Sequence, residues 1–270
     1  MAKADIVIGR CKLCLTTNID LQRSHLIPAG AYKLIRSSDG TPPIVMKRTV
    51  TIKKDEQITD YVLCRECEQR FSVKGEQWVL EHCNQFGAGF KLANLIDQAE
   101  PLHVAGDVSV YDASRIPEIE TEKLAYFAAS VLWRGSAHDW HSGKDPVRTP
   151  KLGAYEEDFR KYLFGQGPFP NAFFGIDILK DKNAWASVFV PYGSRQEGLE
   201  WRYIFPFLGI VFVFLLGKSL DPSRFRYCAY RSPERFITRG AMKSDTIIND
   251  VGRLMTRSRV VGQLKPNRKK

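Results

Sequence analysis

The chain has 270 residues, 44% hydrophobic and 26% charged, a composition typical of soluble globular proteins and unlike that of disordered or membrane-embedded chains. The 40 Lys and Arg against 30 Asp and Glu give a net charge of +10, and residues 223–270 alone hold 13 basic and three acidic residues. The whole excess therefore lies in this last segment. It suits a polyanion, most simply nucleic acid, or serves as a solubilising terminus.

No secretory signal is recognisable, because MAKADIVIGR is not followed by a long apolar run. The most apolar segment, residues 203–217, contains Pro206 and is shorter than the about 20 residues that a spanning helix needs. Its β-branched and aromatic residues predict one or two buried strands, with membrane insertion as the alternative. We therefore expect a cytoplasmic protein without a membrane segment, whose cysteines are thiols rather than disulfides.

Two short cysteine pairs lie in the first third of the chain, Cys11-Lys-Leu-Cys14 and Cys64-Arg-Glu-Cys67. Each pair directs two thiolates to one side, and together they complete the tetrahedral shell of a structural zinc ion. We predict a structural Zn²⁺ on Cys11, Cys14, Cys64 and Cys67. The alternative is two redox-active or merely buried pairs. The remaining cysteines are isolated and are predicted to lie in the core, at Cys83 and Cys228.

Residues 44–52 (IVMKRTVTI) alternate apolar and polar side chains and are rich in β-branched residues, which predicts a strand. Residues 61–71 (YVLCRECEQRF) predict a strand that enters the second cysteine pair and leaves it as a helix. That helix continues or restarts over residues 74–86. Around residues 100–120 the composition changes and no helical period is sustained, so we expect a boundary there.

Two helices are predicted beyond that boundary. The first, over residues 121–138, is apolar on most sides and therefore buried, whereas the second, over residues 151–165, is amphipathic. Strand-like segments and a basic helix follow, over residues 186–192, 203–217, 225–231 and 241–259. We expect an α+β protein made of three parts, residues 1–100, 101–222 and a basic segment 223–270.

Ser24-His25-Leu26-Ile27-Pro28 lies between the cysteine pairs, and Leu63-Cys64-Arg65-Glu66-Cys67 opens the following helix. This order resembles the HNH endonuclease family over residues 8–85. It is also similar to a pattern in uncharacterised bacterial proteins, Cys-x-x-Cys, Ser-His-x-Ile-Pro and Cys-x-x-Cys-Glu, followed by the Ser-Val-x-Trp-Arg of residues 130–134. The resemblance implies a zinc-braced ββα-metal (treble-clef) unit, then a mixed helix and strand domain and a basic C-terminal helix or tail.

In that family the histidine ending the first strand takes a proton from the attacking water, and a divalent ion stabilises the transition state. The resemblance therefore implies that His25 is the general base, with Glu68, Glu76 or His82 as catalytic partners at Mg²⁺ or another divalent ion. Ser24 stands where the family usually has an acid, and Glu68 stands where an asparagine commonly follows the last cysteine. The alternative is that His25 is a satisfied structural histidine.

The resemblance implies a metal-dependent endonuclease that hydrolyses phosphodiester bonds of nucleic acid, with DNA as the expected substrate and bacterial or phage defence as the context. Arg134 either binds phosphate or pairs with a buried acid. The alternative is a catalytically inactive zinc-binding module for nucleic acid or protein, and a protein partner or a homo-oligomer stays open. The expected nucleic-acid contacts are basic residues beside the histidine and in the tail: Arg23, Lys33, Arg253, Arg257 and Arg259.

Overall fold

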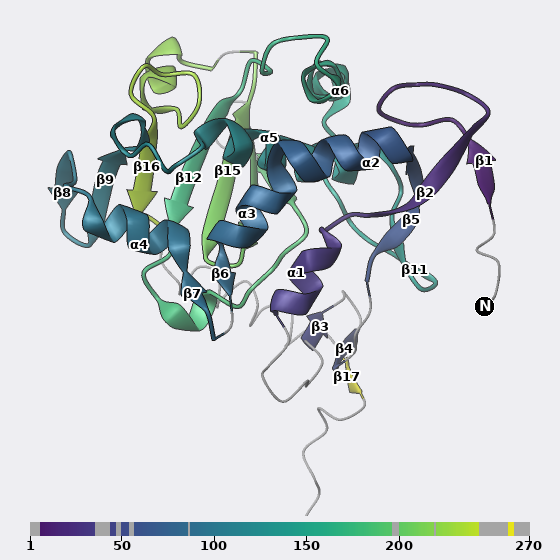
Figure 1. Ribbon diagram of the computed structural model, residues 1–270, viewed down its shortest axis with the longest axis horizontal. Helices are drawn as coiled ribbons and strands as arrows, with labels where there is room; N and C mark the ends of the chain where they lie inside the picture. The colour runs from purple at the N-terminus through teal and green to yellow at the C-terminus, as the bar shows by residue number, and fades with distance from the viewer. Residues whose placement is uncertain are drawn as a thin grey trace, which may run out of the picture.

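The computed structural model describes residues 6–35, 44–46, 50–53, 57–85, 87–195, 200–218, 220–242 and 259–261. Within these residues the chain mixes helices and strands, which confirms the predicted α+β class (Figure 1). Most of the basic helix predicted over residues 241–259, with Arg253 and Arg257, lies outside the described residues.

The N-terminal part is a three-stranded antiparallel sheet followed by a long helix. The strands lie in the order β1, β2, β5, with bounds Val7–Gly9, Ile19–His25 and Thr59–Cys64. Helix α2 (Arg65–Phe71) leaves β5 directly, as predicted. The chain then continues through a π turn at Ser72–Glu76 into α3 (Gln77–His82), so the predicted helix continues rather than restarts.

Between β2 and β5 the chain forms helix α1 (Ala29–Leu34) and a hairpin. The strand predicted over residues 44–52 is two strands, β3 (Ile44–Met46) and β4 (Val50–Lys53), which pair antiparallel. On the other edge of β4 lies β17 (Arg259–Val261), which runs parallel to it. The predicted tail residue Arg259 is therefore placed in a strand beside the N-terminal part of the chain.

The second sheet has seven strands and forms most of the left half of the molecule in Figure 1. Its neighbouring strands are antiparallel, except for the parallel pair β12 and β16. In sheet order the strands are β13 (Tyr192–Arg195), β14 (Trp201–Phe207), β15 (Ile210–Leu216), β12 (Phe173–Ile178), β16 (Phe236–Arg239), β9 (Val108–Asp112) and β8 (His103–Ala105).

The apolar run at 203–217 forms most of two antiparallel strands, β14 and β15, whose side chains are mostly buried, which confirms the prediction of one or two buried strands. The two strands are joined at Leu208 and Gly209, which have φ angles of 48° and 89°. Only glycine fits at the second position, because an added Cβ would lie 2.4 Å from a ring carbon of Phe90. Among the described residues, no helix is long and apolar enough to cross a membrane.

Helix α5 (Thr121–Ala137) lies between the seven-stranded sheet and the helix formed by α2, the π turn and α3, and it is buried along nearly its whole length, as predicted. On one side the ring of Phe127 contacts Phe207 and Phe212 of the second sheet, at centroid distances of 4.8 and 5.6 Å. On the other side Gly75 of the π turn lies against the α5 backbone. Helices α3, α4 (Lys91–Gln98) and α5 thus cover one face of the sheet, as seen in Figure 1.

One hydrophobic cluster contains residues from all three predicted segments, for example Cys11, Phe174 and Ile237. It also holds Cys83 and Cys228, both fully buried, which confirms their predicted core positions. Strand β16 belongs to the predicted basic segment, yet it pairs with β12 and β9 inside the second sheet. The three-part division of the chain stays a prediction about its organisation, and the packing is continuous across it.

Helix α6 (Glu156–Phe164) confirms the predicted amphipathic helix, but the strand predicted over residues 225–231 is wrong. Residues Pro222–Tyr227 form a 3₁₀ helix, because Pro222 favours a first helical position and the Asp221 carboxylate accepts from the Ser223 N–H at 2.9 Å. Of the strand predicted over residues 186–192, only the bridge from Val188 to Phe207 and Tyr192, the first residue of β13, have β-structure. Short two-residue strands complete the fold: β6 (Asn84–Gln85), β7 (Gly89–Phe90), β10 (His141–Ser142) and β11 (Asp145–Pro146).

Candidate metal centre and the His25 region

The four predicted cysteines come together at one end of the three-stranded sheet. Cys11 and Cys14 lie in the turn between β1 and β2, whereas Cys64 ends β5 and Cys67 lies in the first turn of α2. Their sulfur atoms all lie within 4.8 Å of one another. Backbone hydrogen bonds fix the turn: the Lys12 N–H donates to the Val62 carbonyl, and the Cys64 N–H donates to the Cys11 sulfur at 3.4 Å.

These residues fit a structural zinc ion. Hydrogen bonds, first from Cys67 and then from backbone amides, outweigh burial and lower the pKa of Cys11 to about 4. Burial raises the pKa of Cys64 to about 12, and the pKa of Cys67 is also raised. Four thiolates this close repel one another, so a bound cation is needed to keep all four ionised. A tetrathiolate set of this kind is what Zn²⁺ prefers in structural sites.

His25 is the last residue of β2 and its ring is half-buried. Its Nε2 lies 2.8 Å from Oε1 of Gln57, a residue just before β5 that the sequence analysis did not single out. Burial lowers the pKa of His25 below its ordinary 6.5; the hydrogen bond to Gln57 opposes this shift, and the nearby Arg134 adds to it. The ring is therefore neutral near pH 7.

Ser24, which stands where the HNH family usually has an acid, is fully buried. Its side chain faces opposite to that of His25, as successive strand residues do. The Ser24 hydroxyl accepts from the Leu63 N–H at 3.1 Å and lies within hydrogen-bonding reach of Glu68. Ser24 therefore joins β2 to β5 and to the start of α2 inside the protein, where a serine is satisfied without a metal.

Arg134 is 1% exposed and lies at the centre of this region. Its Nη1 donates to the His25 carbonyl at 2.8 Å, its Nη2 donates to Glu76 Oε1 at 2.5 Å, and its guanidinium lies 5.1 Å from the ring centre of Phe71. Of the two roles predicted for Arg134, the structure shows the pairing with an acid, and the side chain of that acid, Glu76, is 15% exposed. The guanidinium is a fixed positive charge that joins α5, the π turn and the end of β2.

Glu68 lies about two turns before Glu76 in the continuous helix formed by α2 and the π turn. Burial raises the pKa of Glu68, although the positive charge of Arg134 and the hydrogen bond with Ser24 oppose the shift. Its Oε1 is buried and has no hydrogen-bond partner among the described residues. Glu68 and Glu76 therefore both lie in the field of Arg134, and only Glu76 pairs with it directly.

His82 is engaged elsewhere. Its Nδ1 lies 2.8 Å from the Trp78 carbonyl, and its ring stacks on that of Trp78 at 3.9 Å. Across the described ranges, the four cysteines are the one group of three or more His, Cys, Asp and Glu ligands close enough to share an ion. The structure thus brings Glu68 and Glu76 to the His25 region through Arg134, but it does not group His25, Glu68, Glu76 and His82 as ligands of one ion.

A second histidine contact lies beside the same strands. Nε2 of His138, just after α5, is 2.8 Å from Oδ2 of Asp60, which is the cross-strand partner of Ser24. Burial raises the pKa of Asp60, but hydrogen bonds from His138 and from the Tyr61 N–H outweigh it and leave the pKa lowered. This pair had no signal in the sequence, because 78 residues separate its members.

The predicted nucleic-acid contacts near the histidine are both on the surface. Arg23 is exposed on β2 and donates from Nε to the Thr59 hydroxyl at 2.9 Å, and Lys33 is exposed in the last turn of α1. In the basic segment, three arginines form ion pairs within the fold: Arg224 with Glu200, Arg235 with Glu122 and Arg239 with Asp97.

Comparisons of the chain with protein-family models, with curated proteins and with solved structures found no match.

Proposed function

We propose that this chain is a zinc-stabilised nucleic-acid-binding module of the HNH-related ββα (treble-clef) kind, in which an internal arginine has replaced the catalytic metal ion. The observation that carries the proposal is the placement of Arg134, whose buried guanidinium pairs with Glu76 and holds the His25 carbonyl. The order of β2, β5 and α2, with the cysteines at their ends, is consistent with the ββα arrangement that the sequence resemblance implies.

The charge balance argues against a second ion at this place. A divalent ion beside His25 would take its carboxylate ligands from Glu68 or Glu76, because Ser24 offers only a neutral hydroxyl there. Arg134 already supplies a positive charge to both acids, and a metal ion close to the guanidinium would be repelled by it. The buried guanidinium therefore neutralises these acids as a divalent metal ion would, but it offers no open coordination position for water or a phosphate.

Affinity for nucleic acid is supported by the excess of positive charge in the last part of the sequence. Residues 243–270 hold eight Lys and Arg against two Asp, and they follow the part of the basic segment whose arginines pair inside the protein. Arg23 and Lys33 add exposed positive charge beside β2 and α1. Neutralising backbone phosphates with such residues releases counterions, which makes binding favourable and salt-dependent.

The proposal is tested by titrating labelled single- and double-stranded DNA and RNA with the zinc-loaded full-length chain and following fluorescence anisotropy. We expect the affinity to fall steeply as salt rises from about 50 to 200 mM, by about 10³-fold if six phosphates are contacted. If none of the four nucleic acids binds at the lower salt concentration, the proposal is wrong.

A second candidate, a metal-dependent HNH endonuclease, is favoured by one specific observation. A general base must be unprotonated at the working pH, and the lowered pKa of His25, with Nε2 held by Gln57, meets that requirement. On this alternative, Mg²⁺ or another divalent ion would bind through Glu68. Cleavage that requires the added ion and disappears in His25→Ala would favour this candidate over the first.

A further inference from the structure

A cleft of about 250 Å³ lies where the first cysteine turn meets helices α5 and α6. None of the residues singled out as nucleic-acid contacts lies in it. The cleft is lined by apolar side chains and by charges of both signs, among them Arg10, Lys12, Leu15, Trp133, Ala137 and Glu156. It opens directly beside the cysteines that would hold zinc, because Cys11 is part of its wall.

One wall is fixed by Arg160, which is only 8% exposed. Its Nε and Nη2 donate to the two carboxylate oxygens of Glu157 at 2.7 and 2.8 Å, and its Nη1 donates to the Leu13 carbonyl at 2.7 Å. Arg160 therefore joins α6 to the cysteine turn and sets the width of the cleft. Because its guanidinium and the Glu157 carboxylate satisfy each other, neither supplies a charge for a ligand.

The other charged side chains that line the cleft have polar atoms left to bind a ligand. Oε2 of the half-buried Glu156 accepts from the Ser136 hydroxyl, and no hydrogen bond from a described residue reaches its Oε1. Arg10 and Lys12 are exposed on the cysteine turn, and Arg10 uses its Nε to hold the Leu15 carbonyl at 3.3 Å. The cleft thus offers one anionic acceptor and two cationic donors, between the apolar side chains of Leu15 and Ala137.

This lining does not favour a lone phosphate. A zinc ion with four thiolate ligands keeps a net negative charge, which Arg10 and Lys12 partly offset from the same turn. An anion in the cleft would in addition face Glu156. A neutral, flat group with hydrogen-bond donors on one edge and acceptors on another satisfies both kinds of side chain without this repulsion.

We propose that the cleft receives one unstacked base of a single-stranded nucleic acid, and that it prefers guanine or cytosine. These bases carry both an amino group, which donates to Glu156, and a ring carbonyl, which accepts from Arg10 or Lys12; carboxylates and basic side chains read base edges in this way. The volume is slightly below the about 300–1,000 Å³ of sites for drug-sized ligands, so a single base is of suitable size.

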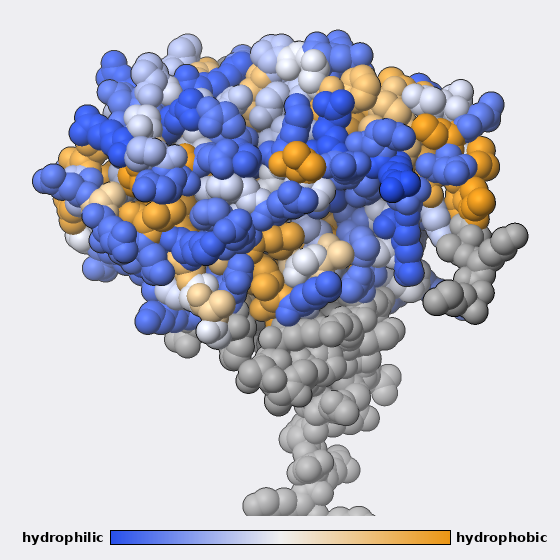
Figure 2. Space-filling view, viewed as in Figure 1, coloured by the Kyte–Doolittle hydropathy of each residue, from blue (hydrophilic) through white to orange (hydrophobic). Residues whose placement is uncertain are grey.

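The surface next to the cleft suits the rest of such a strand. Ile6, just before β1, is 74% exposed, Ile8 in β1 is 57% exposed, and Leu15 is 37% exposed. In Figure 2 hydrophobic residues gather at the end of the molecule where β1 lies. Flat bases can rest on this apolar surface while their phosphates stay in water. This inference rests on the proposed nucleic-acid-binding function and assigns to it a site and a base preference.

The test compares 12-residue oligothymidylates that carry one central guanine, cytosine, adenine or thymine, bound to the zinc-loaded full-length chain at one salt concentration. The central guanine or cytosine is expected to bind about tenfold more tightly than the central thymine or adenine. Glu156→Gln removes the anionic acceptor and is expected to abolish that preference. Arg10→Ala/Lys12→Ala is expected to weaken binding of all four strands and to reduce the preference.

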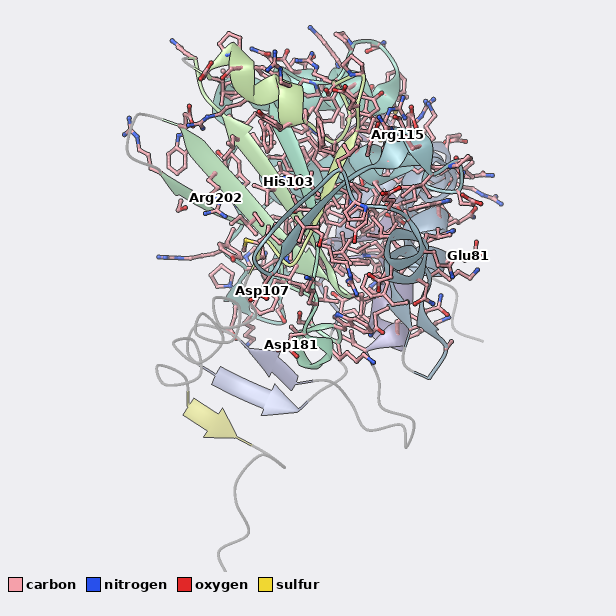
Figure 3. The ribbon with its side chains drawn as sticks, turned by 90° about the vertical axis from the view of Figure 1, so that its left-hand side faces the viewer. Glu81, His103, Asp107, Arg115, Asp181 and Arg202 are labelled. Atoms are coloured by element: carbon pink, nitrogen blue, oxygen red, sulfur yellow. The ribbon has the colours of Figure 1, made fainter. Side chains whose placement is uncertain are left out.

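Matched controls are Glu118→Gln and Lys91→Ala/Arg115→Ala, which make the same changes of charge away from the cleft. Arg115 lies on the face toward the viewer in Figure 3, the side of β8 and β9 and not that of β1. Zinc content and the unfolding midpoint verify that each variant is folded. Equal binding of the four strands, or a preference unchanged in Glu156→Gln, would overturn the cleft proposal and leave the proposed function intact. Failure of the parent chain to bind any strand would overturn both.

Discussion

Arg134 is the residue on which the account of the His25 region depends. It is buried, its ion-pair partner Glu76 lies 58 residues away in sequence, and its carbonyl contact at His25 lies 109 residues away. Burying a guanidinium is costly unless its donors are satisfied, and here a carboxylate and a carbonyl satisfy them. The same contacts that make Arg134 stable hold the end of β2 against α5 and the π turn.

Replacing this arginine leaves acidic side chains without their cation. We expect Arg134→Met to lower the free energy of unfolding by about 3–5 kcal/mol, as is typical when one partner of a buried ion pair is removed. Chemical denaturation measures the loss. Lys91→Met, which breaks the exposed pair with Glu81, should change the free energy by no more than about 1 kcal/mol. Equal losses in the two variants would contradict the central role of Arg134.

The lowered pKa of His25 predicts a pH dependence of stability. Well above pH 6.5 the ring is neutral in both states, so it makes no pH-dependent contribution there. As the pH falls below 6.5, the unfolded chain takes up a proton that the folded chain resists, and the free energy of unfolding falls until the folded pKa is passed. Denaturation at pH 7.5 and 6.0 should show a larger loss for the parent than for His25→Gln. Parallel profiles would show that burial of His25 does not disfavour its protonated form.

For single residues, the sequence predicted those that belong to a short motif and missed those that meet only in the folded chain. The cysteine spacing predicted the four-thiol cluster, and the comparison with the HNH pattern drew attention to Ser24. Neither motif predicted the contact of Gln57 with His25 or the pairing of His138 with Asp60. Such contacts join segments tens of residues apart, and only the packing of strands and helices decides which of many polar residues meet.

Among the secondary-structure elements, the long helix α2–α3 with its π turn determines how closely α5 packs beside the ion pair of Arg134 and Glu76. Gly75 lies in that turn, where an added Cβ would be 2.9 Å from the Phe127 backbone nitrogen and 3.0 Å from the Lys123 carbonyl oxygen. The extra residue of a π turn locally changes which side chains face the neighbouring helix. Here it allows close approach to α5 next to Glu76, so helix geometry and the ion pair support each other.

Gly75→Ala tests that close approach. In an ordinary helix interior the change would stabilise by up to about 1 kcal/mol. Here the contacts are with backbone atoms that cannot rotate away, so we expect a net destabilisation of about 1–3 kcal/mol in chemical denaturation. Val73→Ala, in the same turn but 54% exposed, is the control and should be close to neutral. A stabilising Gly75→Ala would show that α5 and the π turn are not tightly packed.

Helices and strands with a regular apolar pattern were predicted well, whereas a segment whose conformation depends on a capping residue or a proline was not. Helices α5 and α6 and the hairpin β14–β15 follow their apolar patterns. Residues 225–231 have the composition of a strand, but the preceding Asp221 and Pro222 start a 3₁₀ helix instead. The order of the strands outside the hairpins had no signal in the sequence, since the pairs β12–β16 and β16–β9 join segments that are distant in sequence.

For the whole molecule, the continuous core predicts that the metal site and the second sheet depend on each other. Removing zinc with a strong chelator should lower the midpoint of thermal unfolding followed by circular dichroism, because the cysteine turn packs against α5 and α6 and α5 packs against the sheet. Cys11→Ser should have the same effect, and adding zinc back should restore only the parent. Unchanged melting of the sheet after zinc loss would show that the two parts are independent.

The most direct test of the account measures bound metal and cleavage in the same preparation. Full-length chain purified with zinc is analysed for metals and then incubated with plasmid DNA and with single-stranded DNA and RNA in Mg²⁺ or Mn²⁺, beside His25→Ala and Arg134→Met. We predict one zinc per chain, bound nucleic acid and no cleavage by the parent. A second metal ion per chain, together with cleavage that His25→Ala abolishes, would contradict it.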